Sequence, residues 1–198
     1  MFSKYKTFIQ QHISLNFIEW NIIKSKLKIE YFKKGDIIHP IGDVCKELRF
    51  MSSGLARGYI IDEEGKDNTW SIYFNDKNSH ITNLFVIDFE SYLHQSPSKL
   101  AIDALEDSVV VTTAYEDVEF IYKNTKKGER FGRLMAQEAY CYLHDYIITR
   151  QTTTAKERFE KFVKTTPHLL KKVPQYHIAT LLGITPQHLS RLKREMKL

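Results

Sequence analysis

The sequence lacks the features of several common protein classes. It contains only two cysteines, Cys45 and Cys141, and they are too far apart to form a metal-ligand pair. A single disulfide between them is compatible with the count, but we expect reduced thiols. No stretch approaches the roughly 20 apolar residues of a membrane span, and the first residues, MFSKYKTFIQQHI, lack the apolar core of a secretory signal. We therefore expect a cytoplasmic protein that does not enter the membrane.

Sequence motifs of catalysis and metal binding are also missing. There is no phosphate-binding glycine loop and no His-x-His pair, and His39, His80 and His94 stand alone. The main enzymatic alternative, a metal-dependent enzyme on a cupin-like β-barrel, would need such clustered ligands. We predict no catalytic residue, no metal ligand and no cofactor, although an unknown small-molecule effector is compatible with the sequence. A haem or redox sensor, using Cys45, Cys141 or a lone histidine, stays open as an alternative.

The charge of the chain is unevenly distributed. The net charge is +5, and 42% of the residues are hydrophobic, which is typical of a globular protein. Residues 153–198 contain ten Lys and Arg against three acidic residues, a net charge of +7, which leaves −2 for residues 1–152. A basic C-terminal unit on a slightly acidic body is typical of a nucleic-acid-binding protein.

The segment VPQYHIATLLGITPQHLSRLKREMK, residues 173–197, predicts two short helices joined by a tight turn. Pro174 suits a first helical turn, and Gly183 suits a left-handed residue at a helix end. Thr185 followed by Pro186 indicates an N-cap and the first residue of a second helix. The small Ala179 lies where the two helices must approach each other. This pattern predicts a helix-turn-helix whose second helix enters the major groove of DNA.

The second of these helices has the polar side chains that DNA recognition requires. Gln187 can pair with adenine and Arg191 with guanine, each through two hydrogen bonds. Ser190, Lys193 and Arg194 suit phosphate contacts, which give affinity without sequence information. His188 is predicted to reach a base, a phosphate or only solvent. Thr185 caps the helix, whose N-terminus can then face a phosphate.

In the rest of the chain, the predicted secondary structure changes from helix to strands and then back to helix. Residues 4–28 predict helix, and the region from Ile29 to about Tyr122 has short apolar runs between turn signals, including FNDKNS (74–79). The predicted strands are Asp36–His39, Leu48–Ser52, Leu55–Ile61, Thr69–Phe74, Lys99–Ala104 and Ser108–Ala114. DEEGKDN (62–68) predicts a hairpin turn. A helix from about Lys126 to Gln151 follows, too long to be buried in one small domain, and another is predicted from Ala155 to about Thr165.

This order of elements resembles the Crp/Fnr superfamily, the cyclic-AMP receptor and fumarate-nitrate regulators of bacteria. The similarity covers nearly the whole chain and includes KKGDIIHPIGD (33–43), SSGLARGYIIDEEGK (52–66), ALEDS (104–108) and IATLLGITPQHLSRLKREM (178–196). It implies an α+β fold. Residues 1–125 would form an antiparallel β-roll (a double-stranded β-helix, as in cyclic-nucleotide-binding domains) with flanking helices, 126–152 a long dimerisation helix and 153–198 the helix-turn-helix domain.

The resemblance also implies a function. A transcription regulator of this family binds double-stranded DNA as a homodimer, here through residues 128–150, and it can contact RNA polymerase. The family's cyclic-nucleotide site has a Gly-Glu pair and an Arg-Ser pair, but this sequence has Ile87-Asp88 and Ser98-Lys99 in those places. We expect Asp88, Ser98 and Lys99 to line an effector pocket that does not bind cyclic AMP, because the single ammonium of a lysine cannot replace the two parallel hydrogen bonds of an arginine. A regulator of the same scheme that binds no ligand at all stays open as an alternative.

Overall fold

The computed structural model describes residues 2–76 and 83–197, so the predicted turn at 74–79 and His80 fall largely outside the described residues. The helices are α1 (Phe2–His12), α2 (Phe17–Ser25), α3 (Phe89–His94), α4 (Tyr115–Asn124), α5 (Lys126–Thr152), α6 (Ala155–Thr165), α7 (Leu169–Lys172), α8 (Gln175–Leu182) and α9 (Pro186–Glu195). The strands are β1 (Leu27–Phe32), β2 (Ile37–His39), β3 (Glu47–Ser53), β4 (Leu55–Ile61), β5 (Asp67–Phe74), β6 (Phe85–Val86), β7 (Ala101–Ala104) and β8 (Ser108–Ala114).

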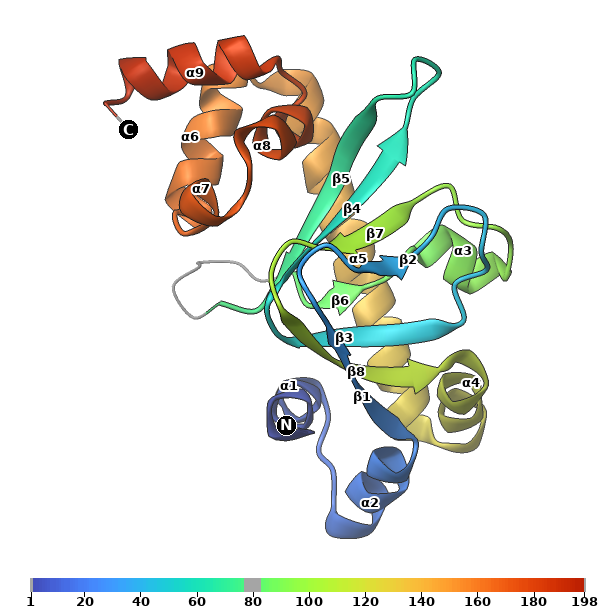
Figure 1. The fold of residues 1–198 in the computed structure, drawn as a ribbon. Coiled ribbons are helices and arrows are strands. Elements are labelled where there is room, and N and C mark those ends of the chain that lie inside the picture. The colour runs from blue at the N-terminus through green and yellow to red at the C-terminus, as the bar shows by residue number, and fades with distance from the viewer. Residues whose placement is uncertain (1, 77–82, 198) are drawn as a thin grey trace.

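The strands form an antiparallel β-roll, which confirms the predicted fold class. One sheet has the order β1-β8-β3-β6 and the other β2-β7-β4-β5, so strands distant in sequence are neighbours in both. Side chains of the two sheets pack against each other in a core made of Ile38, Met51, Ala56, Tyr73, Val86, Leu100, Ile102, Ala104 and Val110. Figure 1 shows α1, α2 and α4 at one end of the roll, α5 running along it, and α6 to α9 beside the β4–β5 hairpin.

The hairpin between β4 and β5 is as the sequence predicts. The carboxylate of Asp62 accepts hydrogen bonds from the backbone N–H groups of Glu64 at 3.0 Å and Lys66 at 2.9 Å. Gly65 has a φ of 79°, the left-handed conformation that glycine adopts at least cost. The turn therefore fixes the register of two long strands, of which β5 contacts α8.

The N-terminal prediction was partly wrong. Residues 4–28 are not one helical region, because Asn16 ends the loop after α1 and starts α2 with a capping box: its side chain accepts from the Glu19 N–H at 2.9 Å. Residues from Leu27 onward form β1, paired along its length with β8. Tertiary pairing with a strand some 80 residues away overrides the local helical pattern. The short helices α3, α4 and α7 were also missed.

The long helix α5 matches the predicted boundaries closely. Gly128 and Gly132, one turn apart, face α4: a Cβ at Gly132 would lie 2.5 Å from the Tyr122 ring. The absence of a side chain at both positions lets α4 pack tightly on the first turns of α5. Among the helices in the described part of the chain, none has both the length and the apolar character needed to span a bilayer.

Candidate DNA-binding surface and effector region

The C-terminal helices share one apolar core. Phe159 from α6, Leu169 from α7, Ile178 and Ala179 from α8 and Leu189 from α9 are all almost completely buried. Ala179 is 0% exposed, so a larger side chain would push the helices apart. The predicted role of this small residue at the closest approach of the two helices fits the observed packing.

The turn between α8 and α9 has the predicted geometry. Gly183 is left-handed, with φ of 68° and ψ of 38°, and its N–H donates to the Thr180 carbonyl at 3.0 Å. Thr185 is the N-cap of α9, and its hydroxyl accepts from the His188 N–H at 3.2 Å. Pro186 is the first residue of α9. Pro174 differs slightly from expectation, because it occupies the N-cap position of α8 rather than its first turn.

The outer face of α9 carries the predicted DNA-contacting side chains. Leu189 and Leu192 are buried, whereas Thr185, Gln187, Ser190, Arg191 and Arg194 are exposed and His188 and Lys193 are half-buried. Within the described residues, the only ion pair that any of these side chains makes is a weak one, at 4.0 Å between Arg191 and Glu195 on the same helix. Figure 1 shows α9 at the edge of the molecule, on the side of α8 that faces away from the β-roll. The helix thus presents donors and acceptors that the fold itself does not use.

The helix-turn-helix is packed directly on the β-roll of the same chain. Leu55, Ile72 and Phe74, from β4 and β5, belong to the same buried cluster as the core of the C-terminal helices. Helix α8 contacts β5, and Figure 1 shows it beside the β4–β5 hairpin. The position of α9 is therefore set by the β4–β5 hairpin as well as by the end of α5.

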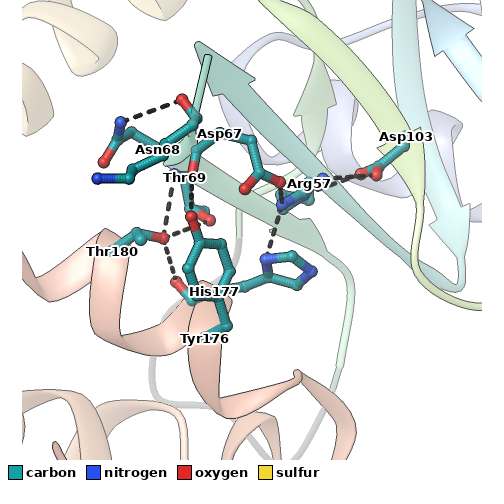
Figure 2. Close-up of polar contacts among 9 residues, drawn as sticks. Arg57, Asp67, Asn68, Thr69, Asp103, Tyr176, His177 and Thr180 are labelled. Atoms are coloured by element: carbon teal, nitrogen blue, oxygen red, sulfur yellow. Dashed lines mark hydrogen bonds and ion pairs between the residues drawn. The ribbon is translucent and has the colours of Figure 1, made fainter. Parts of the chain in front are cut away.

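A charged cluster lies at this junction (Figure 2), and we call its four residues, Arg57, Asp67, Asp103 and His177, the Arg57 cluster. The guanidinium of Arg57, 6% exposed, donates to both oxygens of Asp103 at 3.1 and 2.9 Å and to Asp67 at 2.5 Å. It also donates to Nδ1 of His177, on α8, at 2.7 Å. Because a guanidinium only donates, Nδ1 must accept, and the imidazole is neutral with its proton on Nε2.

Burial, followed by the positive charge of Arg57, lowers the pKa of His177 below its usual value, although Asp67 and Asp103 act in the opposite direction. Protonation would remove the acceptor at Nδ1 and place a second positive charge beside Arg57. The contact between the β-roll and α8 is therefore made by the neutral form of His177.

Uncharged hydrogen bonds extend this junction (Figure 2). The Thr180 hydroxyl accepts from the Thr69 N–H at 3.2 Å and lies 3.0 Å from the Thr69 hydroxyl, while the Tyr176 hydroxyl donates to the Asp67 carbonyl at 3.0 Å. Sequence reasoning missed all of these contacts. They join segments more than 100 residues apart, and only the repeated occurrence of polar residues on the inner face of α8 hinted at them.

Of the three predicted effector residues, Asp88 and Ser98 are in contact, and Lys99 is not part of that contact. The Asp88 carboxylate caps α3 by accepting from the N–H groups of Glu90 and Ser91 at 3.0 and 3.3 Å, and it also accepts from the Ser98 hydroxyl at 2.5 Å. Ser98 is buried, but Lys99 is exposed. Asp88 and Ser98 thus satisfy each other and the first turn of α3, and the lysine is not part of that group.

The interior of the roll near these residues is filled by an aromatic ring. The Tyr73 hydroxyl donates to the Ile87 carbonyl at 3.1 Å. A Cβ added at Gly58 would lie 2.9 Å from the Tyr73 hydroxyl and 3.4 Å from Leu100. The absence of a side chain at Gly58 accommodates the tyrosine, whose ring occupies space between the sheets.

The two faces of α5 differ in exposure. In the N-terminal half of α5, Phe131 is buried and Met135 is half-buried against α1 and the β-roll. The apolar side of that half therefore packs against the same chain. On another face the exposed apolar side chains are Tyr140, Leu143, Ile147 and Ile148. Tyr140, Leu143 and Ile147 follow the spacing of three and four residues that a coiled-coil seam has.

The residues considered for metal or haem binding lie apart. In residues 2–76 and 83–197 no three His, Cys, Asp or Glu side chains lie close enough to hold a metal ion. Cys45 is buried, and its burial raises the pKa of its thiol, whereas Cys141 is exposed on α5. His39 is buried, and burial lowers its pKa. These environments give none of the three a partner for shared ligation.

Comparisons with known proteins agree with the fold. No protein-family model matches the sequence, and no curated protein matches it. Among solved structures, FixK2 from Bradyrhizobium japonicum matches with a TM-score of 0.71 at 15% identity, over 86% of this chain and 84% of that one. The c-di-GMP responsive global regulator CLP from Xanthomonas campestris matches with a TM-score of 0.62 at 10% identity, over 90% of each chain.

A transcriptional regulator of the Crp/Fnr family from Eubacterium rectale matches with a TM-score of 0.61 at 18% identity, over 92% of this chain and 84% of that one. The similarity therefore includes the β-roll, the long helix and the C-terminal helices together. The chain has the fold of Crp/Fnr regulators.

Proposed function

We propose that this protein is a sequence-specific transcription regulator that binds double-stranded DNA through α9. The observation that carries the proposal is the outer face of α9: a capped helix whose exposed polar and basic side chains have almost no partners within the described chain. In a helix-turn-helix, such a helix enters the major groove. Gln187 and Arg191 would contact adenine and guanine, and Ser190, Lys193 and Arg194 would contact phosphates. His188 would reach a base or a phosphate.

The regulator would act as a homodimer through residues 128–150 of α5. The exposed side chains of Tyr140, Leu143 and Ile147 support this interface, because burying them against a second copy removes apolar surface from water. Two copies related by a two-fold axis would present two α9 helices to successive major grooves. The cytoplasm is the expected location, and contact with RNA polymerase would follow on promoter DNA.

The pocket predicted at Asp88, Ser98 and Lys99 stays a prediction. We expect it not to bind cyclic AMP, because Ser98-Lys99 replaces the Arg-Ser pair whose arginine would hold the cyclic phosphate. A ligand there would have to displace the Asp88–Ser98 hydrogen bond. The haem and cupin-like alternatives receive no support from the positions of Cys45, Cys141 and His39.

The proposal is tested by measuring DNA affinity against salt concentration. We expect log K to fall linearly with log salt, and the double variant Lys193→Ala/Arg194→Ala to reduce the slope by about 4 for a dimer, at roughly 0.9 for each phosphate that is no longer neutralised. The matched control, Lys28→Ala/Lys34→Ala, removes the same charge from exposed positions on the β-roll. An equal reduction of the slope in the control would overturn the assignment to α9.

A further inference from the structure

A cavity of about 320 Å³ lies outside both regions described above, between α1, α2, α4 and the first turns of α5. Its walls are mainly apolar and include Ile9, Ile13, Ile23, Leu48, Val118 and Phe131. The cores of proteins contain few voids larger than a water molecule. An apolar space of this size is therefore a suitable place for an apolar ligand.

The size of the cavity limits the ligand. An engineered apolar cavity of about 150 Å³ holds benzene, which has six non-hydrogen atoms. A cavity about twice as large suits a molecule of about 12 non-hydrogen atoms. A saturated carboxylic acid of ten carbons has that number of atoms and is flexible enough to follow an irregular wall.

The rim of the cavity is positively charged. Lys126, Lys127 and Glu19 are the charged residues of its lining. The Lys127 ammonium donates to the two Glu19 oxygens at 2.8 and 2.9 Å, which neutralises that pair. Lys126 is exposed and forms no ion pair with another described residue. A positive charge thus remains at the edge of an apolar space, where it would attract the head group of an amphipathic anion.

The cavity also contacts the helix through which the dimer would form. Lys126, Lys127, Gly128 and Phe131, all in the first two turns of α5, line it. Helix α5 continues from there to Thr152, next to the helix-turn-helix. A ligand that changes the packing of α1 or α4 on these turns would change the direction of a long, rigid helix.

We propose that this cavity binds a lipophilic monocarboxylate, with its chain among Ile13, Val118 and Phe131 and its carboxylate at Lys126, and that this ligand is an effector of DNA binding. The effector role rests on the function proposed above, whereas the binding site does not. The site is distinct from Asp88, Ser98 and Lys99, which lie at α3 and β7.

Calorimetry with decanoate tests the site on the full-length protein. We expect one decanoate per chain and a negative heat-capacity change. Octanoate, which is two methylene groups shorter, should bind about 15-fold more weakly, at roughly four-fold per methylene. Decan-1-ol should also bind more weakly than decanoate. Absence of binding at millimolar decanoate would overturn the site, and equal affinity for decan-1-ol would overturn the role of the carboxylate.

Variants locate the ligand. Val118→Phe and Ile23→Phe fill the cavity from two sides, and each should weaken decanoate binding at least ten-fold. Ile23 is only half-buried, so a larger side chain there should disturb folding less than one at the buried Val118. The control Val109→Phe makes a similar change at a half-buried position on β8 that does not line the cavity. Unchanged binding in both folded cavity variants would place the ligand elsewhere and overturn the proposal.

The head group is tested by a matched pair of charge variants. Lys126→Ala should weaken decanoate binding about three- to five-fold, within the range of an exposed ion pair. Lys123→Ala removes the same charge three residues earlier, on α4 and outside the cavity lining, and should leave affinity unchanged. An equal effect of the two variants would overturn the specific role of Lys126.

The effector role is measured separately, by DNA affinity with and without saturating decanoate. We expect a change of at least five-fold, the lower end of typical coupling between sites. Bound decanoate with unchanged DNA affinity would overturn the effector role. Bound decanoate with no DNA binding in either state would overturn the proposed function and leave the lipophilic site supported.

Discussion

Removing the side chain of Arg57 should loosen the contact between the β-roll and the DNA-binding helices. Its guanidinium is almost fully buried and bonds to Asp103, Asp67 and His177. In Arg57→Ala, two carboxylates would remain at the junction without their counter-ion. Removing one partner of a buried ion pair costs about 3–5 kcal/mol. Because the side chain of Asp67 is 32% exposed, we expect the lower end, about 3 kcal/mol of unfolding free energy.

Urea unfolding provides the assay, followed by tryptophan fluorescence. The chain has two tryptophans, Trp20 on α2 and Trp70 on β5, and their combined emission follows global unfolding. Amide hydrogen exchange of α8 gives a second, local readout. We expect exchange in α8 to be accelerated in Arg57→Ala more than exchange in β8, which lies in the other sheet.

The control for Arg57→Ala is Lys66→Ala, at the tip of the same hairpin. Lys66 forms an exposed ion pair with Glu64, which is expected to contribute less than about 1 kcal/mol. A double-mutant cycle between Arg57→Ala and His177→Ala should give a coupling energy of about 1 kcal/mol or more, since the hydrogen bond joins a charged donor to a neutral acceptor. A destabilisation below about 1 kcal/mol in Arg57→Ala, with unchanged exchange in α8, would refute the role of the cluster.

Other predictions concern the same helices. The pKa of His177 is lower in the folded protein than in the unfolded chain. The contribution of neutral His177 to stability is therefore complete above pH about 6.5 and is lost as pH falls through the folded pKa. We expect the difference in unfolding free energy between wild type and His177→Asn to shrink below pH about 6.5. Gly183→Ala places a β-carbon at a φ of 68°, and we expect a destabilisation of about 1 kcal/mol, seen as a melting temperature lower by about 2–4 °C. Arg191→Ala should keep weak, salt-sensitive binding but lose the preference for the specific site, measured by competition with unrelated DNA; unchanged selectivity would contradict the base contact. Leu143→Asp should convert a dimer into a monomer in sedimentation, and a persisting dimer would exclude this face of α5.

The helix-turn-helix could be predicted from the sequence because its signals are local. Gly183, Thr185 and Pro186 each specify a backbone conformation within a few residues, and the structure has all three as expected. The strands on either side of the hairpin were predicted for a similar reason, because Asp62 and Gly65 indicate a turn from the local sequence alone and so bound the two strands. The predicted helix from Ala155 to about Thr165 is also present as α6, whose N-terminus is fixed by a local capping box at Thr154 and Glu157.

The remaining features depend on contacts between distant parts of the chain. Strand β1 was missed because its conformation is decided by pairing with β8. The Arg57 cluster joins three strands and α8, and although Asp67 lies in the same hairpin as Arg57, the contacts of Arg57 to Asp103 and His177 span 46 and 120 residues. The cavity beside α5 depends on how α1, α2 and α4 pack, which no local pattern encodes. Such features follow from tertiary packing rather than from propensity.

In the proposed function, two α9 helices of a dimer contact DNA in successive major grooves. The most direct test is selection of duplexes from a random pool by the full-length protein, followed by sequencing. We expect a two-fold symmetric site whose half-sites are centred about one helical turn, or about 10 base pairs, apart, and we expect that Arg191→Ala no longer enriches that site. Failure to enrich any sequence, or enrichment of a site without two-fold symmetry, would contradict this mode of binding.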